Sequence, residues 1–344
     1  MSLQTGYALA VRADGSVIAW GQQMPGGAGA AVAGTAAHIV DGVTTAEAVV
    51  ATTATGPAYA LRSDGSVVGW GDGRSGTLGT VFAAGAATIV ATPNVVPQLA
   101  RIVQLSGSGR LALDADGALW AFPLYADVTA SAIVAYKIPG ISKVARISRE
   151  CGAIVNVCEF AAIDTAGKAW AVGLFDSVVT PGPGVAMVTA LSGWPLLSRM
   201  ECAGHCLAVD VDGNVWAKGN NFSGQLGDGS NVNKTLPMRL TTISGIKEVA
   251  VGLNYSYAIS GTGALYSWGD YVLNGRDDRI ANNTPSLVPS VSGVQEIAVG
   301  PNDRLVRLSD GTVWGWGANQ LGELGTASPG ASYVPVRVTG VNIN

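Results

Sequence analysis

The four cysteines are the residues whose type and spacing point most directly to chemistry. They form two close pairs, Cys151 with Cys158 and Cys202 with Cys206. Cysteines this close can form disulfides, which would indicate an oxidising compartment. Free buried thiols and a zinc site that includes His205 are the alternatives, although neither spacing is customary for zinc. We predict two disulfides, and we predict no metal or other cofactor.

Other catalytic arrangements have little support in the sequence. The only histidines are His38 and His205, and no Gly-x-Ser-x-Gly elbow presents a serine nucleophile. The segment 229–235 lacks the glycine that a phosphate-binding loop needs before Lys234. Asp210-x-Asp212-Gly resembles the start of a calcium loop but lacks the glutamate that follows, so an ordinary turn explains it. We predict no catalytic residues.

These residues are set in a repeat that runs through residues 1–344. Each copy has a turn glycine, and the spacing between successive copies averages roughly 49 residues. The turn glycines are Gly15, Gly65, Gly117, Gly167, Gly213, Gly263 and Gly311. Aspartate precedes five of them, and Asp-Gly between alternating apolar runs is a strong hairpin signal that favours positive φ at both positions. We predict a single domain of seven units.

Each unit is predicted to contain four strands. The first lies just before the turn glycine, in residues 8–11, 58–61, 111–113, 160–163, 207–209, 257–259 and 305–308. A second follows the turn and carries large residues three and five positions after the glycine, which places both on one face. A proline-marked strand and a further apolar strand complete the unit, for example 237–240 with 246–251 and 288–291 with 294–299. The tryptophans of the second strand are expected to pack between sheets; ligand binding or photochemistry is the alternative.

Seven four-stranded units predict an all-β, seven-bladed β-propeller. The chain opens inside a unit, and residues 334–344 match the two strands that the first unit lacks. We therefore expect the C-terminal strands to complete the N-terminal blade and close the ring. In units two, five and seven a glycine-rich loop follows, with Leu78, Leu226 or Leu324 expected to anchor it from below.

Composition narrows the classes of partner. The chain is 48% hydrophobic and 13% charged, with a net charge of −4 and no run of basic residues, so nucleic-acid binding is not expected. No apolar stretch is long enough for a transmembrane helix. The chain begins directly in repeat sequence without a leader. The missing leader and the cysteine pairs together favour an extracytoplasmic or secreted protein whose leader has been removed. A cytoplasmic protein is the alternative. We expect the protein to be a monomer.

The repeat resembles that of the regulator-of-chromosome-condensation family. The motif that carries the resemblance is Asp-Gly-x-Val-x-x-Trp-Gly followed by Asn-x-x-Gly-Gln-Leu-Gly, and residues 206–229 match it almost position for position. The resemblance covers the whole chain, and the short units rich in Ala, Thr and Val are most similar to bacterial or phage members. It implies a propeller that presents loops to a protein partner. The basic surface of a chromatin binder and the Trp-Arg cluster of a plant photoreceptor are missing.

One ring of positions is a candidate for partner binding. The residue eight before each turn glycine differs from unit to unit: Tyr7, Pro57, Gly109, Glu159, His205, Tyr255 and Asp303. We predict that Tyr7, Glu159, His205, Tyr255 and Asp303 contact a protein partner, because equivalent positions that vary are free of packing constraints and tyrosine is a favoured interface residue. Ordinary loop chemistry, or for His205 a structural role, is the alternative.

The function predicted from these observations is that of a non-catalytic protein-binding scaffold, such as an inhibitor or an adhesion protein. One alternative is a carbohydrate-active hydrolase or lyase that would use carboxylates such as Glu159 and Asp303. A guanine-nucleotide exchange factor is the remaining alternative.

Overall fold

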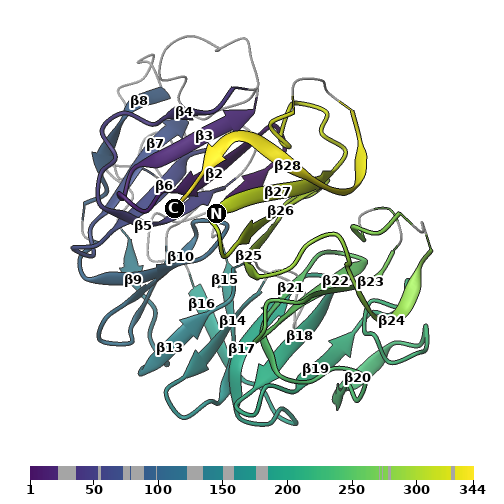
Figure 1. The fold of residues 1–344 in the computed structure, drawn as a ribbon. Coiled ribbons are helices and arrows are strands. Elements are labelled where there is room, and N and C mark those ends of the chain that lie inside the picture. The colour runs from purple at the N-terminus through teal and green to yellow at the C-terminus, as the bar shows by residue number, and fades with distance from the viewer. Residues whose placement is uncertain are drawn as a thin grey trace.

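The computed structural model describes residues 1–21, 36–52, 56–72, 78, 89–97, 99–121, 135–149, 159–175, 185–270, 272, 274–277, 280–326 and 330–344, without the side chains of residues 159, 175 and 185. The described residues form seven four-stranded antiparallel sheets. These sheets are arranged around a common centre (Figure 1). The predicted seven-bladed propeller is confirmed.

Successive blades take successive segments of the chain. Blade one contains β1 (Ser2–Gln4), β2 (Tyr7–Val11), β3 (Val17–Gly21) and β4 (His38–Ile39). Blade two contains β5 (Ala46–Ala51), β6 (Ala58–Arg62), β7 (Val67–Asp72) and β8 (Ile89–Val95). Blade three contains β9 (Ile102–Leu105), β10 (Leu111–Asp114), β11 (Leu119–Ala121) and β12 (Tyr136–Lys137). Blade four contains β13 (Val144–Ile147), β14 (Glu159–Asp164), β15 (Ala169–Phe175) and β16 (Val185–Ala190).

The remaining three blades follow the same order. Blade five contains β17 (Leu197–Cys202), β18 (His205–Asp210), β19 (Val215–Gly219) and β20 (Lys234–Arg239). Blade six contains β21 (Ile246–Val251), β22 (Tyr255–Ser260), β23 (Leu265–Gly269) and β24 (Asn282–Leu287). Blade seven contains β25 (Val294–Val299), β26 (Asp303–Leu308), β27 (Thr312–Gly317) and β28 (Ser332–Asn342). In each blade the first strand is the inner one and the fourth is the outer one.

The turn glycines have the left-handed conformation that the repeat requires. In blade one the Gly15 N–H donates to Arg12 O at 2.9 Å, and Gly15 has φ +77°. Asp14 has negative φ, and its carboxylate accepts the Ser16 N–H. The expectation of positive φ at both turn positions is therefore wrong. The hairpin is a four-residue turn closed by a left-handed glycine, which needs only one such residue.

The hydrophobic core lies between neighbouring blades. Leu207 and Val215 of blade five, for example, pack in one cluster with Val249 and Trp268 of blade six. Trp20, Trp70, Trp268 and Trp316, five positions after their turn glycines, are buried. The predicted packing role of these tryptophans is confirmed. Three tryptophans at the other position donate Nε1–H to an aspartate of their own turn: Trp120 to Asp114, Trp170 to Asp164 and Trp216 to Asp210.

One predicted outer strand is misplaced. The sequence favours residues 288–291, but the outer strand of blade six is β24, which ends at Leu287. Val288 and Val291 are buried at the start of the link to blade seven, and Pro289 and Ser290 form a turn between them. Apolar residues of a buried link resemble a strand in composition, so the pattern alone does not separate the two.

Ring closure also differs from the expectation. The N-terminal blade is completed by β1, which pairs with β2 through Leu3 and Ala8, whereas β28 pairs with β27 in blade seven. The prediction that the C-terminal strands complete the N-terminal blade is therefore wrong. After β28, Ile343 donates its N–H to Gly311 O and packs in one cluster with Leu3. The two chain ends thus meet at the join between blades seven and one (Figure 1).

Four of the outer strands share a proline at one structural position. In four blades the proline directly precedes the residue where pairing with the third strand shifts register. These prolines are Pro93, Pro237, Pro285 and Pro335. Because proline lacks an N–H and favours bulges, each outer strand is irregular at this point.

Candidate functional site

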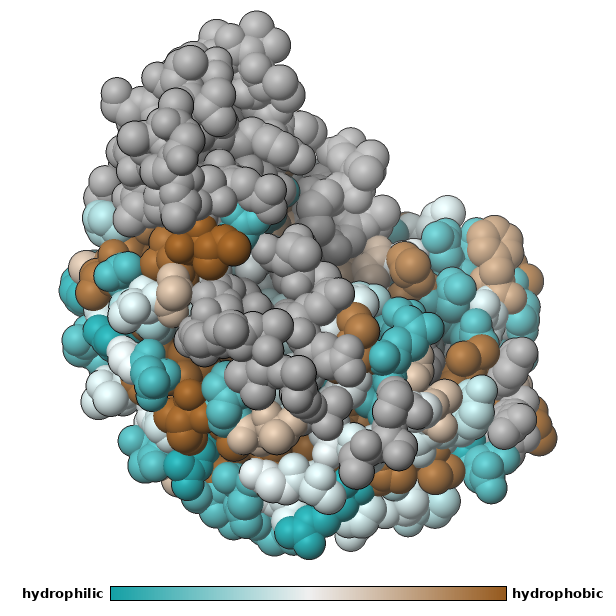
Figure 2. All heavy atoms as spheres, turned by 90° about the horizontal axis from the view of Figure 1, so that it is seen from above, coloured by the Kyte–Doolittle hydropathy of each residue, from teal (hydrophilic) through white to brown (hydrophobic). Residues whose placement is uncertain are grey.

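The propeller has two faces of different character. Connections between the first and second strands, and between the third and outer strands, lie on one face, which we call the loop face. The hairpins with the turn glycines and the links between blades lie on the opposite face, which we call the turn face. On the side seen in Figure 2, hydrophobic residues are interspersed with hydrophilic ones.

The loop 220–233 of blade five is organised by one buried asparagine. The Asn221 side chain donates to Asp228 Oδ1 and Ser230 O at 3.0 Å, and also to Val232 O. Its Oδ1 accepts the Leu226 N–H at 2.9 Å, and Leu226 is fully buried. The leucine therefore anchors the loop from below as predicted, and the asparagine fixes its path from within.

This fixed loop carries large apolar side chains into solvent. Phe222 is 74% exposed, and Val232 of the same loop is also exposed. Leu253, in the first connection of blade six, is 70% exposed. The Leu253 carbonyl accepts from Gln225 Nε2, so the two connections contact each other. Phe222, Val232 and Leu253 are thus exposed apolar residues on two connections that contact each other, and we call these three residues the loop-face patch.

Beneath the patch, His205 links blades five and six. Its Nε2 lies 2.6 Å from Ser256 Oγ, and that hydroxyl donates to Gln225 O. Trp268 Nε1 donates to the same carbonyl at 2.8 Å. Burial lowers the His205 pKa to about 3, against a smaller opposing contribution from the backbone of Leu253, so the ring is neutral at physiological pH.

The predicted ring positions lie at the start of their strands, but most of the side chains point into the protein. Tyr7, His205 and Asp303 are buried, and Tyr255 is partly buried with the Arg304 guanidinium 3.9 Å from its ring centre. Burial raises the pKa of Tyr7. The side chain of Glu159 is outside the described residues. Their role in partner binding stays a prediction, and interior packing accounts for the side chains that the structure describes.

Asp303 has a structural contact of its own. Its Oδ1 accepts the Asn319 N–H at 2.8 Å, and Asn319 organises the loop of blade seven as Asn221 does in blade five. Burial raises the Asp303 pKa to about 6, although the Asn319 hydrogen bond opposes this shift. The carboxylate therefore fixes a loop.

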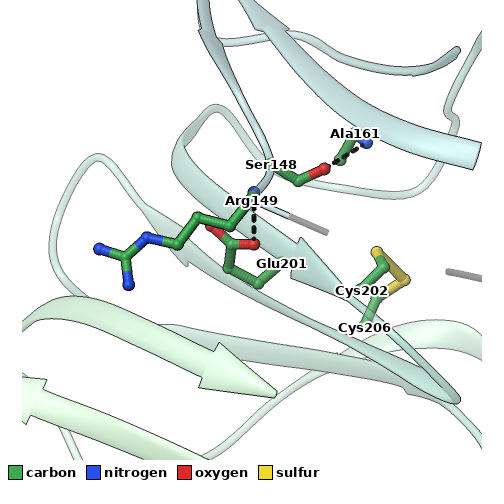
Figure 3. The surroundings of a disulfide bond; sticks show 6 residues. All are labelled: Ser148, Arg149, Ala161, Glu201, Cys202 and Cys206. Carbon is green, nitrogen blue, oxygen red and sulfur yellow. Dashed lines mark hydrogen bonds between the residues drawn. A yellow bond between two sulfur atoms is a disulfide. The ribbon is translucent and has the colours of Figure 1, made fainter. Parts of the chain in front are cut away.

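One of the two predicted cysteine pairs can be assessed. Cys202 and Cys206 lie opposite each other in β17 and β18, with Cα atoms 4.1 Å apart and their sulfur atoms joined (Figure 3). Cys151 and Cys158 lie outside the described residues. The oxidation state of both pairs in solution stays a prediction.

The centre of the ring contains charged residues that the repeat pattern did not reveal. A cavity of about 540 Å³ is lined by the inner strands. Arg149, just after β13, reaches across it to Glu248 of blade six, while its own N–H donates to Glu201 at 2.9 Å. Figure 3 shows the Arg149 side chain extending away from the cysteine pair. In the sequence, only the presence of charged residues within the otherwise apolar inner strands indicates this charged centre.

In the same cavity, cationic groups balance the negative charge of Glu296 of blade seven. It accepts from the Met1 ammonium and lies 3.6 Å from Arg307 Nε. Burial alone would raise the pKa of Glu296, but the ammonium, Arg149 and Arg307 together lower it.

In the described part of the chain, no group of three His, Cys, Asp or Glu side chains is placed to hold a metal ion. No helix there is long and apolar enough to span a membrane.

Sequence comparison identifies the repeat. The profile of the Regulator of chromosome condensation (RCC1) repeat matches residues 212–259 and 310–343. The chain is 35% identical over 92 residues to the Ultraviolet-B receptor UVR8 of Arabidopsis thaliana, covering 24% of this chain and 21% of that protein. It is 35% identical over 98 residues to human Probable E3 ubiquitin-protein ligase HERC3, covering 27% of this chain and 9% of that protein. The matches thus span a small part of each relative.

Structural comparison extends the likeness to the whole fold. Prp20p of Saccharomyces cerevisiae superposes with a TM-score of 0.73 at 18% identity, covering 97% of this chain and 88% of that chain. Human WBSCR16 superposes with a TM-score of 0.70 at 19% identity, covering 88% and 85%. The two profile matches begin one residue before Gly213 and Gly311, the turn glycines of blades five and seven. The chain is therefore a seven-bladed β-propeller, and its residues 212–259 and 310–343 match the RCC1 repeat.

Proposed function

We propose that the protein is a non-catalytic scaffold that binds a protein partner through its loop face. The loop-face patch carries this proposal. Phe222 and Leu253 are large, strongly exposed apolar residues on loops fixed by buried hydrogen bonds. Aromatic residues on a preorganised surface are typical binding hot spots, because little conformational entropy is lost when they are covered.

Protein binding by structural neighbours supports the class of function. Prp20p has been described together with its binding to Gsp1p and histones, and yeast RCC1 (Prp20) has been solved bound to Kap60. The mild acidity of this chain, with a net charge of −4, favours a protein surface over nucleic acid. An inhibitor or adhesion role is the specific form that we propose.

We also propose an extracytoplasmic protein of the bacterial or phage type. The close pair Cys202–Cys206 supports export, because stable disulfides form in oxidising compartments. The short blades rich in Ala, Thr and Val support the proposed origin.

Matched pairs of apolar substitutions on the two faces test the binding surface. The double variant Phe222→Ser/Leu253→Ser alters the loop-face patch, and Leu196→Ser/Val211→Ser removes comparable exposed side chains from the turn face. Each purified protein would be used as bait in extract of the producing cells and in its culture medium. We expect the wild type and the turn-face variant to retain a partner in stoichiometric amount. The amount retained by the loop-face variant should be lower by about tenfold or more. Equal retention by both variants would exclude the patch as the binding surface.

A further inference from the structure

A second cavity lies beside the central one, between the inner strands of blades three, four and five. Its volume is about 390 Å³, and its charged lining residues are Arg146, Arg149, Arg199 and Glu201. Val103 at its edge is 54% exposed and Arg146 is exposed, so solvent reaches it. Three arginines against one glutamate leave the lining with a net charge of +2, in a protein whose net charge is −4.

Two of these arginines occupy the same structural position in neighbouring blades. Arg146 pairs with Ile163 and Arg199 pairs with Val209, each at the register shift near the start of the inner strand. The equivalent residues elsewhere are Ala48, Gln104, Glu248 and Glu296. Packing therefore does not dictate the residue type at this position. Arg146 and Arg199 lie at equivalent levels of neighbouring inner strands.

The carboxylates near this pair also contact Arg149. Glu248 receives the Arg149 side chain, and Glu201 accepts the Arg149 N–H. Arg199 Nε donates to a backbone oxygen, Lys247 O, at 2.8 Å. Among the described residues, no carboxylate lies within ion-pair distance of Arg146 or Arg199. Burial lowers the pKa of Arg199. Among the charges around it, Glu248 and Glu201 raise this pKa, whereas Arg146 and Arg149 lower it.

We propose that this cavity binds the phosphoryl group of a small phosphorylated molecule, with Arg146 and Arg199 as its principal ligands. Two guanidinium forks offer paired N–H donors to a tetrahedral oxyanion, and a dianion matches the net charge of the lining. Arg149 remains paired with Glu248 and orders the wall of the cavity. The site opens at the turn-face end of the inner strands, so it is separate from the loop-face patch and does not depend on the proposed function.

Calorimetric titration of the full chain with pyrophosphate, at constant ionic strength, tests the site. Arg146→Gln and Arg199→Gln each remove one guanidinium. Arg239→Gln, on the outer strand of the same blade as Arg199, removes the same charge from a remote exposed position. We expect binding of one pyrophosphate per chain, weakened about tenfold or more by either cavity variant and unchanged by Arg239→Gln. Circular dichroism and thermal melting would establish that each variant is folded.

The ligand series separates the sources of the phosphoryl group. Tighter binding of a sugar phosphate than of pyrophosphate would identify an organic phosphate ester as the ligand class. Tighter binding of pyrophosphate would identify a free inorganic phosphate. In either case the proposal requires that binding weaken when Arg146 or Arg199 is replaced. No binding of any phosphate, or equal weakening in Arg239→Gln, would overturn the proposal. Binding of a glutamate-rich peptide without pyrophosphate binding would also overturn it, and would assign the arginines to a protein partner.

Discussion

Acidification should destabilise the fold through His205, and His205→Gln should remove that sensitivity. Burial lowers the His205 pKa from 6.5 to about 3. Between these values the unfolded chain binds more protons than the folded protein, so the free energy of unfolding falls as the pH falls below about 6.5. Each pH unit in this window costs about 1.4 kcal/mol, which gives about 2 kcal/mol between roughly pH 7.5 and pH 5.

Asp303 has the opposite effect in part of the same window. Burial raises its pKa from 3.8 to about 6, so its contribution is fully present below pH 3.8 and is lost as the pH rises through 6. The wild-type curve alone therefore does not isolate the histidine. The difference between wild type and His205→Gln does, because the two proteins share every other titrating group. Glutamine retains a polar side chain that does not titrate in this range.

Urea unfolding followed by tryptophan fluorescence, at several pH values between about 5 and 7.5, measures this difference. We expect the variant to be less stable near pH 7.5, where His205 is neutral and hydrogen-bonded. The gap between the two proteins should narrow by about 2 kcal/mol at about pH 5. Parallel dependences of the two free energies on pH would refute the argument, because they would mean that His205 titrates equally in the folded and unfolded chain.

Two further predictions concern the loop of blade five and the cysteines. Leu226→Ala should lower the free energy of unfolding, measured in urea, by about 2–5 kcal/mol, because Leu226 is fully buried. The control Leu236→Ala, at a 74% exposed position, should change this free energy by about 0.5 kcal/mol or less. Similar losses in both variants would contradict the anchoring role of Leu226. Peptide mapping of denatured, non-reduced protein should find Cys202 and Cys206 joined in one disulfide and protected from alkylation. Alkylation of both cysteines would contradict the disulfide and remove this support for export.

The fold could be predicted because the repeat encodes it locally. A glycine that must adopt positive φ recurs at each hairpin, as at Gly15, and Trp20 and Trp268 recur five positions later on the face that packs against the next blade. These are requirements of backbone conformation and burial, which a single sequence displays. The link at Val288 and Val291 differs from the prediction, because a buried turn and a short strand have similar apolar composition.

The candidate site was less accessible to sequence reasoning. Variation among Tyr7, His205 and Asp303 suggested freedom from packing, but each of these side chains has its own interior environment, as His205 does with Ser256. Ion pairs between distant blades leave no periodic signal, so the contact of Arg149 with Glu248 required coordinates. Exposure of Phe222 likewise depends on how its loop folds.

The prolines of the outer strands have a consequence for the protein at high concentration. An outer strand with a regular free edge can pair with the same strand of another copy and continue the sheet between molecules. Pro93, Pro237, Pro285 and Pro335 place an irregularity at one level of four such edges. Copies that meet rim to rim therefore cannot align a continuous ladder of hydrogen bonds, so the repeat that builds the ring also limits its growth into intermolecular sheets.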